Sequence, residues 1–538
     1  MPRAGTGSVG GGRGQLPRQM SAGGWDPDGS ELARRTSAPS RARDAQNAPS
    51  MLPTKPILTS LPLILLALAP GERSRPGRGQ ETASSPAAQG VASVDLEAER
   101  SIARRVDRTR ARDVVRAFVA LGARMGGTAS GERSAKLLEA TFAEIGLPTT
   151  RHVARKTWCH EETGWELSVR IDEEEPYTIE RAWPLGFSPA GSGSHPLALE
   201  SDPERALLTG RFRGTRRKAT PPALVLDDGR NSFDGAWPTC GPHPLGRRAK
   251  APGFAISKPE GARLRAALAA GQAVQVDWEL ETRITEANPV TVVATIAPRS
   301  EALPGHVLVC AHGDSDSGGP GANDNASGIA IVLEMARAWK AALEAGELTA
   351  PPIEVRFAVW GKEIHSTADY LRSELGKEVV AVLNFDQAGF GSTGQRLHVE
   401  PDDLPANAAF VRVCARVLAD HAGQPGFPER WATNKSLGGT DSYVFSGNKR
   451  FRADELPAVT MFTSAWGSPD EQPRTTGMPG ESWRERDRVE MDYDVHYHSA
   501  GDTPENTTDK EPENMGWCAR VGLLSILRWL DVLADAER

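Results

Sequence analysis

The sequence predicts an α/β protein with a mixed, mostly parallel β-sheet flanked by helices, into which a smaller β-rich or α+β domain is inserted. Two observations support this prediction. From residue 290 onward, short runs of Val, Ile and Leu alternate with longer segments of helical periodicity, the pattern of strands covered by helices on both faces. Between residues 165 and 284, short alternating strands are separated by frequent Gly and Pro, which indicates a separate small domain.

The first 93 residues are predicted to precede the folded domains. Residues 1–50 are rich in Gly, Pro, Ser, Ala and Arg and lack apolar periodicity, which is typical of disorder or of untranslated upstream sequence. Residues 51–69 have the anatomy of a secretory signal peptide, with Lys55 before an apolar run and Ala67-Leu68-Ala69 at its end. A buried core helix is the alternative, but prolines and polar flanks argue against it. Residues 70–93 read as a Gly/Ser/Pro-rich linker.

The charge is unevenly distributed along the chain. Residues 1–90 contain 11 Lys or Arg against 6 Asp or Glu, whereas the rest contains 52 against 64. The net negative charge of residues 91–538 argues against nucleic acid as a partner. Outside the signal segment, no run approaches the about 20 apolar residues of a membrane-spanning helix, so no span is expected in the mature chain. The five cysteines include no C-x-x-C pair, which argues against a cysteine-built zinc site.

The larger domain is predicted in two pieces, residues 94–164 and 285–538. In the first piece, helical periodicity runs from Asp95 to Gly122, and a second helix covers residues 134–145. In the second piece, strands are expected at residues 290–296, 307–311, 353–360, 379–385 and 458–462. Helices are expected at residues 327–344, 366–374, 405–421 and 513–534. The inserted domain, residues 165–284, is expected to have strands at 167–171, 223–226, 252–257 and 274–278 and a helix at 261–269.

Metal-ligand residue types follow several of these strands, where open α/β sheets bind their ligands. An apolar strand runs directly into His312. A neutral imidazole binds zinc well, and Asp314, two residues on, could accept a hydrogen bond from the other ring nitrogen. Taken alone, a solvent-facing histidine at a strand end is the simpler interpretation.

Three further segments have the same character. The block Gly321–Gly328 opens a helix and holds Asp324; a plain helix N-cap would account for one of its polar residues but not for the whole block. Asp386 ends another apolar strand, and His498 lies in the loop Tyr497–Pro504 before the last helix. Each of these segments, considered alone, is weak evidence for a metal site.

In this order, the segments resemble the co-catalytic dizinc exopeptidase family that includes the bacterial leucyl aminopeptidases and glutamate carboxypeptidase. The family pattern has an Ala-His-x-Asp-Ser strand end, a Gly-Ala-x-Asp-Asn-Ala-Ser-Gly block, a Glu-Glu pair, an Asn-x-Asp strand end and a Tyr-His-x-x-x-Asp-Thr loop. The chain matches four of the five. The resemblance covers roughly residues 95–165 and 285–535 and implies a zinc aminopeptidase-like fold. The inserted segment resembles a protease-associated domain, mainly over Pro252–Trp278.

The resemblance implies two zinc ions held by four residues. Asp324 would bridge both ions, His312 and Asp386 would complete one of them, and His498 would bind the other. Zinc ions in such a pair activate a water molecule and polarise the scissile carbonyl group.

Three residues near these ligands complete the expected site. Asp314 is counted with the catalytic residues. Gly439-Thr440-Asp441-Ser442 resembles the family's Ser-Asp-His segment near the substrate pocket, so Asp441 is a candidate to bind the substrate amine; a supporting or helix-capping role is the equal alternative. Tyr497, beside the zinc-binding histidine candidate, is the other substrate-binding candidate.

The chain departs from the family at the Glu-Glu pair. The segment Trp360–Ile364 holds one glutamate, and the turn into the next helix looks about two residues shorter. Counting from Trp360 puts Glu363 on the general-base position and Ile364 on the ligand position. Three interpretations stay open: Glu363 is the base and the second zinc is under-ligated or borrows His365; Glu363 is the ligand; or the site has decayed. We favour the base.

The expected function is a secreted or periplasmic zinc exopeptidase, an aminopeptidase rather than a carboxypeptidase, acting on peptides or small proteins. Two other classes stay open. A glutaminyl-cyclase-like acyltransferase would use one zinc, and it is disfavoured because such enzymes lack the Gly321–Gly328 block. A catalytically weakened peptide-binding relative is favoured only by the missing glutamate.

Overall fold

The computed structural model describes residues 94–210, 220–227, 235–315, 318–391, 396–434, 440–445, 451, 455–464 and 494–536. The predictions for the upstream segment 1–50, the signal peptide 51–69 and the linker 70–93 therefore lie outside the described residues. Among the helices of the described part, none is both long enough and apolar enough to span a bilayer.

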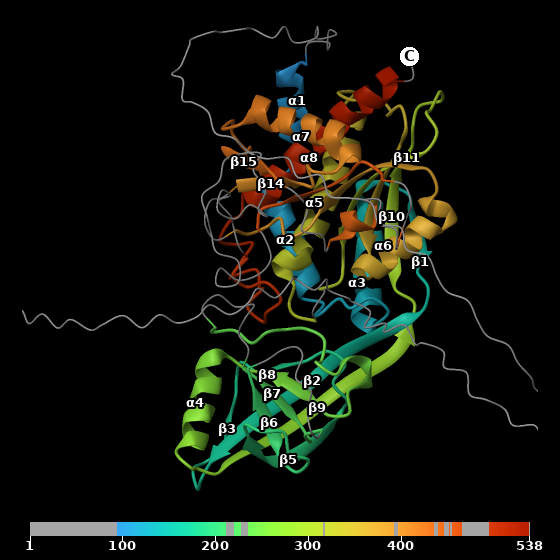
Figure 1. Cartoon of the computed structure of the whole chain (residues 1–538). Helices are drawn as coiled ribbons and strands as arrows, with labels where there is room; N and C mark the ends of the chain where they lie inside the picture. The colour runs from blue at the N-terminus through green and yellow to red at the C-terminus, as the bar shows by residue number, and fades with distance from the viewer. Residues whose placement is uncertain are drawn as a thin grey trace, which may run out of the picture. The chain divides into compact units, whose positions relative to one another are not determined.

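The larger sheet has eight strands in the order β1-β10-β12-β11-β13-β16-β14-β15. Figure 1 labels β10 and β11 of this sheet near the helices α5 and α6. The strands are β1 (Thr149–Val153), β10 (Val290–Ile296), β11 (His306–His312), β12 (Glu354–Trp360), β13 (Val379–Phe385), β14 (Arg396–Glu400), β15 (Arg430–Thr433) and β16 (Ala458–Phe462). Four of the seven pairings are parallel, and the antiparallel ones join β1 to β10, β10 to β12, and β14 to β16. The prediction of a mixed, mostly parallel sheet is confirmed.

Helices cover both faces of this sheet, which explains the continuous apolar runs of its strands. The helices are α1 (Leu96–Ala103), α2 (Arg108–Val119), α3 (Ala129–Ile145), α5 (Ser327–Glu344), α6 (Glu363–Arg372), α7 (Ala408–His421) and α8 (Asn514–Ala536). In β11, Val307 and Val309 join the core beneath α5, whereas Leu308 and Cys310 join the smaller core beneath α6. This alternation follows from the two-residue period of a strand.

Several predicted helices begin or end elsewhere in the structure; for example, α3 begins at Ala129 instead of residue 134, and α7 begins at Ala408 instead of residue 405. The helix expected from Asp95 to Gly122 is two helices, because Asp107 is extended and its carboxylate caps a new helix by accepting from the Thr109 amide at 2.8 Å. Helix α6 begins at Glu363, three residues before the expected Ser366. The edge strands β1 and β15 and the neighbouring interior strand β14 were not predicted.

A second eight-stranded sheet has the order β3-β2-β9-β5-β6-β7-β8-β4. Its elements are β2 (Thr157–Ile171), β3 (Tyr177–Thr178), β4 (Trp183–Pro184), β5 (Gly191–Ala198), β6 (Ala206–Thr209), β7 (Leu224–Leu226), β8 (Gly253–Ala255), β9 (Val274–Ala287) and the helix α4 (Lys258–Ala269). The chain enters through β2 and leaves through its antiparallel neighbour β9. The sheet has its own hydrophobic core. Its resemblance to a protease-associated domain stays a prediction.

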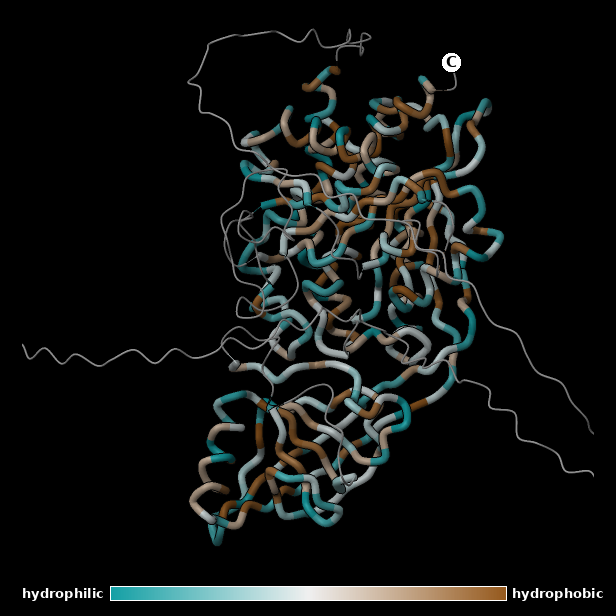
Figure 2. The backbone as a smooth tube through the Cα atoms, viewed as in Figure 1, coloured by the Kyte–Doolittle hydropathy of each residue, from teal (hydrophilic) through white to brown (hydrophobic). Residues whose placement is uncertain are grey.

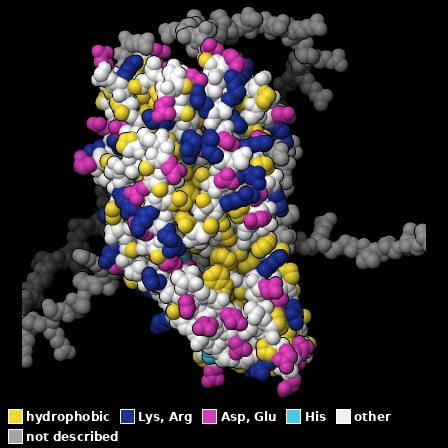
Figure 3. Space-filling model, turned by 180° about the vertical axis from the view of Figure 1, so that it is seen from behind, with side chains coloured by type: hydrophobic (Ala, Val, Ile, Leu, Met, Phe, Trp, Pro, Cys, Tyr) yellow, Lys and Arg dark blue, Asp and Glu magenta, His cyan; other side chains and the backbone are white. Residues whose placement is uncertain are grey.

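The distribution of side chains is that of an ordinary folded surface and interior. Hydrophobic segments gather in the strands of both sheets (Figure 2). On the face shown in Figure 3, basic and acidic side chains are interspersed.

Candidate active site

Parallel pairing brings the first two candidate ligands together. Strands β11 and β13 are neighbours, and their register pairs Cys310 with Asn384. Two residues further on, His312 and Asp386 therefore reach the same edge of the sheet. His312 Nε2 lies 3.4 Å from an oxygen of Asp386, and both side chains are buried.

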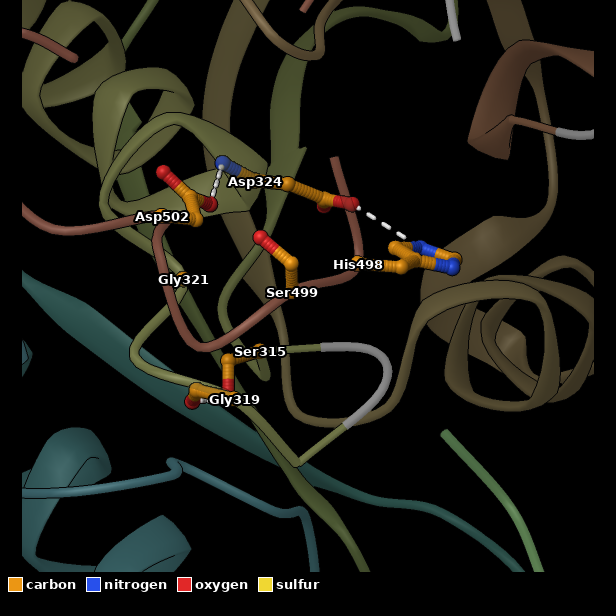
Figure 4. Close-up of a pocket in the computed structure, with 7 residues that line it drawn as sticks. All are labelled: Ser315, Gly319, Gly321, Asp324, His498, Ser499 and Asp502. Atoms are coloured by element: carbon orange, nitrogen blue, oxygen red, sulfur yellow. Dashed lines mark hydrogen bonds and ion pairs between the residues drawn. The ribbon is translucent and has the colours of Figure 1, made fainter. Parts of the chain in front are cut away.

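Asp324 lies between the two histidines. Its residue sits in the turn η2 (Ala322–Ala326), which follows β11 and leads into α5. One carboxylate oxygen is 3.2 Å from His312 Nε2, and the other is 3.0 Å from His498 Nε2, an ion pair drawn in Figure 4. Its own amide donates to Asp502 at 3.0 Å. A carboxylate with one oxygen towards each imidazole has the arrangement that bridging two cations requires.

The hydrogen bond on the far side of the His312 ring suits a metal ligand. Nδ1 lies 3.0 Å from the main-chain carbonyl oxygen of Asp314, which can only accept. Nδ1 therefore carries a proton, and when Nε2 is deprotonated its lone pair can bind a cation that Asp324 and Asp386 also contact. The carboxylate of Asp314 is slightly farther from Nδ1, at 3.3 Å.

The charges in this cluster are strongly coupled. Burial lowers the pKa of His312, but hydrogen bonds to three carboxylates outweigh burial and raise this pKa well above its usual value. Burial raises the pKa of Asp324, yet the two imidazoles bring it well below its usual range. A cation would compete with protons for the same lone pairs, so metal binding here would release protons.

Glu363 joins this cluster from the first turn of α6. Its amide donates to a carboxylate oxygen of Asp314 at 3.1 Å. Ligand atoms of Glu363, His312 and Asp386 all lie within 4.8 Å of one another, and all three residues are buried. Imidazole nitrogen and carboxylate oxygen are the donors that zinc accepts. The residues present therefore fit a zinc ion.

The structure does not support a ligand role for His365. Its Nε2 lies 2.7 Å from the carbonyl oxygen of Arg155, so this nitrogen is already engaged. Ile364, which counting placed on the family's ligand position, belongs to the hydrophobic cluster beneath α6. Because α6 starts at Glu363, the chain turns into the helix before a second glutamate could face the cluster.

The two candidate substrate-binding residues differ in exposure. Asp441, in the short helix η5 (Asp441–Val444), is fully buried and lies 3.0 Å from the hydroxyl of Thr367 on α6. Burial raises the pKa of Asp441 to about 8. This geometry favours the supporting role for Asp441. Tyr497 is half-buried, and its ring stacks on His498 with ring centroids 3.6 Å apart.

A small hollow opens beside these ligands (Figure 4). It is lined by Ser315, Gly319, Gly321, Asp324, His498, Ser499 and Asp502. Gly321 has φ +62°, and a Cβ there would lie 2.3 Å from the Cβ of Ser315. Glycine at this position therefore permits the close approach of the two loops.

The second sheet's domain supports the loop that carries His498. Cys240 donates its amide to the His498 carbonyl at 2.7 Å, and Ala500 donates to Pro238 at 3.0 Å. Thr239 and Ser499 form an antiparallel bridge between these bonds. Main-chain pairing with residues 238–240 therefore fixes the backbone on both sides of Ser499.

Sequence reasoning missed four polar residues around the ligands. Asp502 accepts from the amides of Asn323 and Asp324, and the side chain of Asn323 donates to Asp494 at 2.7 Å. Asp502 and Asn323 lie inside the motifs described above, and the spacing of those motifs could have identified them. Asp494 and Arg124 could not be identified from the sequence, because single charged residues in loops are common.

The mixed α/β sheet carries a cluster of imidazole and carboxylate groups at its edge, and this cluster has the composition of a zinc site. Residues 291–521, which are 231 of the 538 residues, match the model of peptidase family M28. The zinc exopeptidase family indicated by the motifs is confirmed.

Two curated relatives match shorter stretches. An "Aminopeptidase" of Pseudomonas aeruginosa is 42% identical over 98 residues, 17% of each chain. A "Probable lipoprotein aminopeptidase LpqL" of Mycobacterium tuberculosis is 30% identical over 265 residues, 47% of this chain and 48% of the relative. The chain thus spans less than half the length of the curated relatives that it matches.

Two solved structures share the fold. A peptidase M28 precursor from Shewanella amazonensis has a TM-score of 0.54 and 16% identity, covering 80% of this chain and 95% of its own. A zinc aminopeptidase from Bacillus subtilis has a TM-score of 0.52 and 18% identity, covering 79% and 95%.

Proposed function

We propose that the chain is an exported zinc aminopeptidase that removes N-terminal residues from peptides. The observation that carries the proposal is the position of Asp324, with one oxygen towards His312 and the other towards His498 at the edge of an M28-family sheet. Both curated relatives are named aminopeptidases, which favours attack at the amino terminus over the carboxyl terminus.

The zinc ligands in this proposal are the four residues expected from the sequence. Asp324 would bridge two ions, His312 and Asp386 would hold one, and His498 would hold the other. When bound, such ions lower the pKa of a water molecule and polarise the scissile carbonyl group.

The protein's own groups move the proton. Glu363 would accept a proton from the attacking water and pass it to the leaving amine, a role that contributes about 10²–10⁴-fold in rate. Asp314 would hold Glu363 and His312 in register, because it contacts the amide of the first and Nδ1 of the second. Tyr497 would offer the substrate a ring face beside the metal ligands. Asp441 would hold α6 in place by accepting the hydrogen bond from Thr367.

Two observations favour export. The predicted signal peptide at residues 51–69 is one, and the name of the mycobacterial relative, a lipoprotein, is the other. N-terminal sequencing of the protein recovered outside the cytoplasm should give a chain that begins after Ala69. A cytoplasmic protein that keeps residues 51–69 would contradict this part of the proposal.

The experiment that tests the activity combines metal content with substrate hydrolysis. In the presence of added zinc, the purified chain should bind two zinc ions per molecule and hydrolyse amino-acid anilides, but not the same anilides with an acetylated amino group. Hydrolysis that ignores acetylation would contradict aminopeptidase activity. One zinc and no hydrolysis would favour the acyltransferase, and no zinc the non-catalytic relative.

A further inference from the structure

One buried arginine side chain contacts the loops that carry the metal-ligand candidates His312 and Asp324. Arg124 is in the loop between α2 and α3, and its side chain is 1% exposed. Its Nε donates to the carbonyl of Gly313 at 3.0 Å, one terminal nitrogen donates to Pro320 at 3.0 Å, and the other donates to Gly321 at 2.7 Å. Within the described part of the chain, all three hydrogen bonds go to main-chain carbonyls and none to a carboxylate.

These carbonyls belong to the two segments that carry metal-ligand candidates. Gly313 directly follows His312 at the end of β11. Pro320 and Gly321 directly precede the turn that holds Asp324. One planar guanidinium therefore ties the loop after the first ligand to the loop before the second, across eight positions of the chain.

The positive charge also has a place in the electrostatics of the site. Burial lowers the pKa of Arg124 to about 10, while the neighbouring Asp502, Asp314 and Asp324 favour its charged form. The guanidinium thus stays protonated at neutral pH. Its positive charge reduces the electrostatic repulsion among the carboxylates of Asp502, Asp314 and Asp324 even before a metal ion is bound.

We propose that Arg124 is a positioning residue of the metal centre. It holds the Gly313 and Pro320–Gly321 carbonyls so that His312 and Asp324 stand at ligating distance before a cation arrives, and it thereby sets the affinity for zinc. This inference rests on the proposed zinc site but concerns a residue that touches neither metal nor substrate.

Arg124→Lys separates geometry from charge. The ammonium keeps the positive charge, but it lacks the planar fork that reaches three carbonyls at once. Outer groups that orient ligands typically contribute 10–100-fold to metal affinity, so we expect R124K to weaken zinc binding by about that factor. Zinc affinity is measured by competition with a chelator, and excess zinc should restore hydrolysis.

Arg520 is a matched control. It is also largely buried, and it donates to the main-chain carbonyls of Gly426 and Val106 at 2.9 and 3.0 Å, from α8 rather than from the ligand loops. Arg520→Lys should lower the melting temperature while leaving the zinc Kd unchanged. An equal zinc Kd in wild type, R124K and R520K would overturn the inference, whereas wild-type protein that binds no zinc would overturn the proposed function instead.

If R124K does not fold, hydrogen exchange of the wild-type protein with and without zinc still tests the proposal. If Arg124 fixes the loops in advance, the hydrogen-bonded amides of Gly313, Ala322 and Asp324 should already be protected from hydrogen exchange in chelator-treated protein, and zinc should add little. Protection of these amides that arises only after zinc is added would contradict preorganisation by Arg124.

Discussion

A buried histidine far from the proposed substrate site should make the fold sensitive to acid. His306, at the start of β11, is 2% exposed. Its Nε2 lies 3.3 Å from a guanidinium nitrogen of Arg356 and 3.4 Å from the hydroxyl of Tyr370. A guanidinium can only donate, so Nε2 must be the unprotonated acceptor in this arrangement. Protonation would place two positive charges side by side.

The magnitude follows from the two pKa values of His306. Burial, and then the charge of Arg356, lower its pKa in the folded chain to about 3, whereas the unfolded value is near 6.5. Between these values the unfolded chain binds one more proton than the folded chain, so the free energy of unfolding decreases as the pH falls. From pH 7.5 to pH 4.5 the expected loss from this residue is about 2.7 kcal/mol.

His306→Gln isolates this contribution. The Gln carbonyl oxygen can still accept from Arg356, but the side chain does not titrate. Urea unfolding of chelator-treated wild type and variant at pH 7.5 and pH 4.5 should show that the variant loses about 2.7 kcal/mol less. Chelation matters because the ligand cluster is itself pH-sensitive. Equal losses in both proteins, or a His306 signal that titrates near pH 6.5 in NMR spectra, would refute the reasoning.

Three further substitutions test the site. Glu363→Gln should lower turnover by about 10²–10⁴-fold with zinc content unchanged if Glu363 is the base; release of zinc, measured by atomic absorption, would make it a ligand. Ile364→Glu should lower the melting temperature without tightening zinc, because the new carboxylate would enter a hydrophobic cluster; tighter zinc binding would show that the position faces the metals. Gly321→Ala should reduce zinc retention by displacing the turn of Asp324, whereas Gly346→Ala, with φ +71° and open space, should only lower stability by about 1 kcal/mol. Equal zinc retention in these two variants would contradict the steric argument.

The central elements were predictable because burial on both faces leaves a strong signal. The bounds expected for β10, β13, β16 and α5 match the structure, since these segments are runs of apolar residues with polar or glycine ends. Strands β14 and β15 were missed because both are short and contain few apolar residues: Leu397 and Val399 in the first, and Trp431 and Ala432 in the second.

The sequence predicted which residues would form the site, but it did not predict the contacts that support them. Motif spacing indicated His312, Asp324, Asp386 and His498, and the structure brings all four together. The supporting contacts could not be predicted, because they join residues far apart in the chain. Arg124, for example, reaches carbonyls almost 200 positions later, and carbonyls carry no side-chain identity that a sequence could reveal.

The early start of α6 gives the centre two unequal halves. On one side of Asp324, the side chains of His312 and Asp386 would both bind the ion, because His312 Nε2 lies 3.2 Å from Asp324 and 3.4 Å from Asp386. On the other side, the described residues bring His498 to Asp324, and the position where the family has a second glutamate is filled by Ile364 in a hydrophobic cluster. Since affinity for zinc depends on the number of deprotonated ligands that the protein supplies, the half with His498 would hold its ion more weakly. The missing glutamate therefore does not argue against a metal centre. It argues for one whose second ion dissociates first, so that a stoichiometry between one and two is the natural outcome of purification without added zinc.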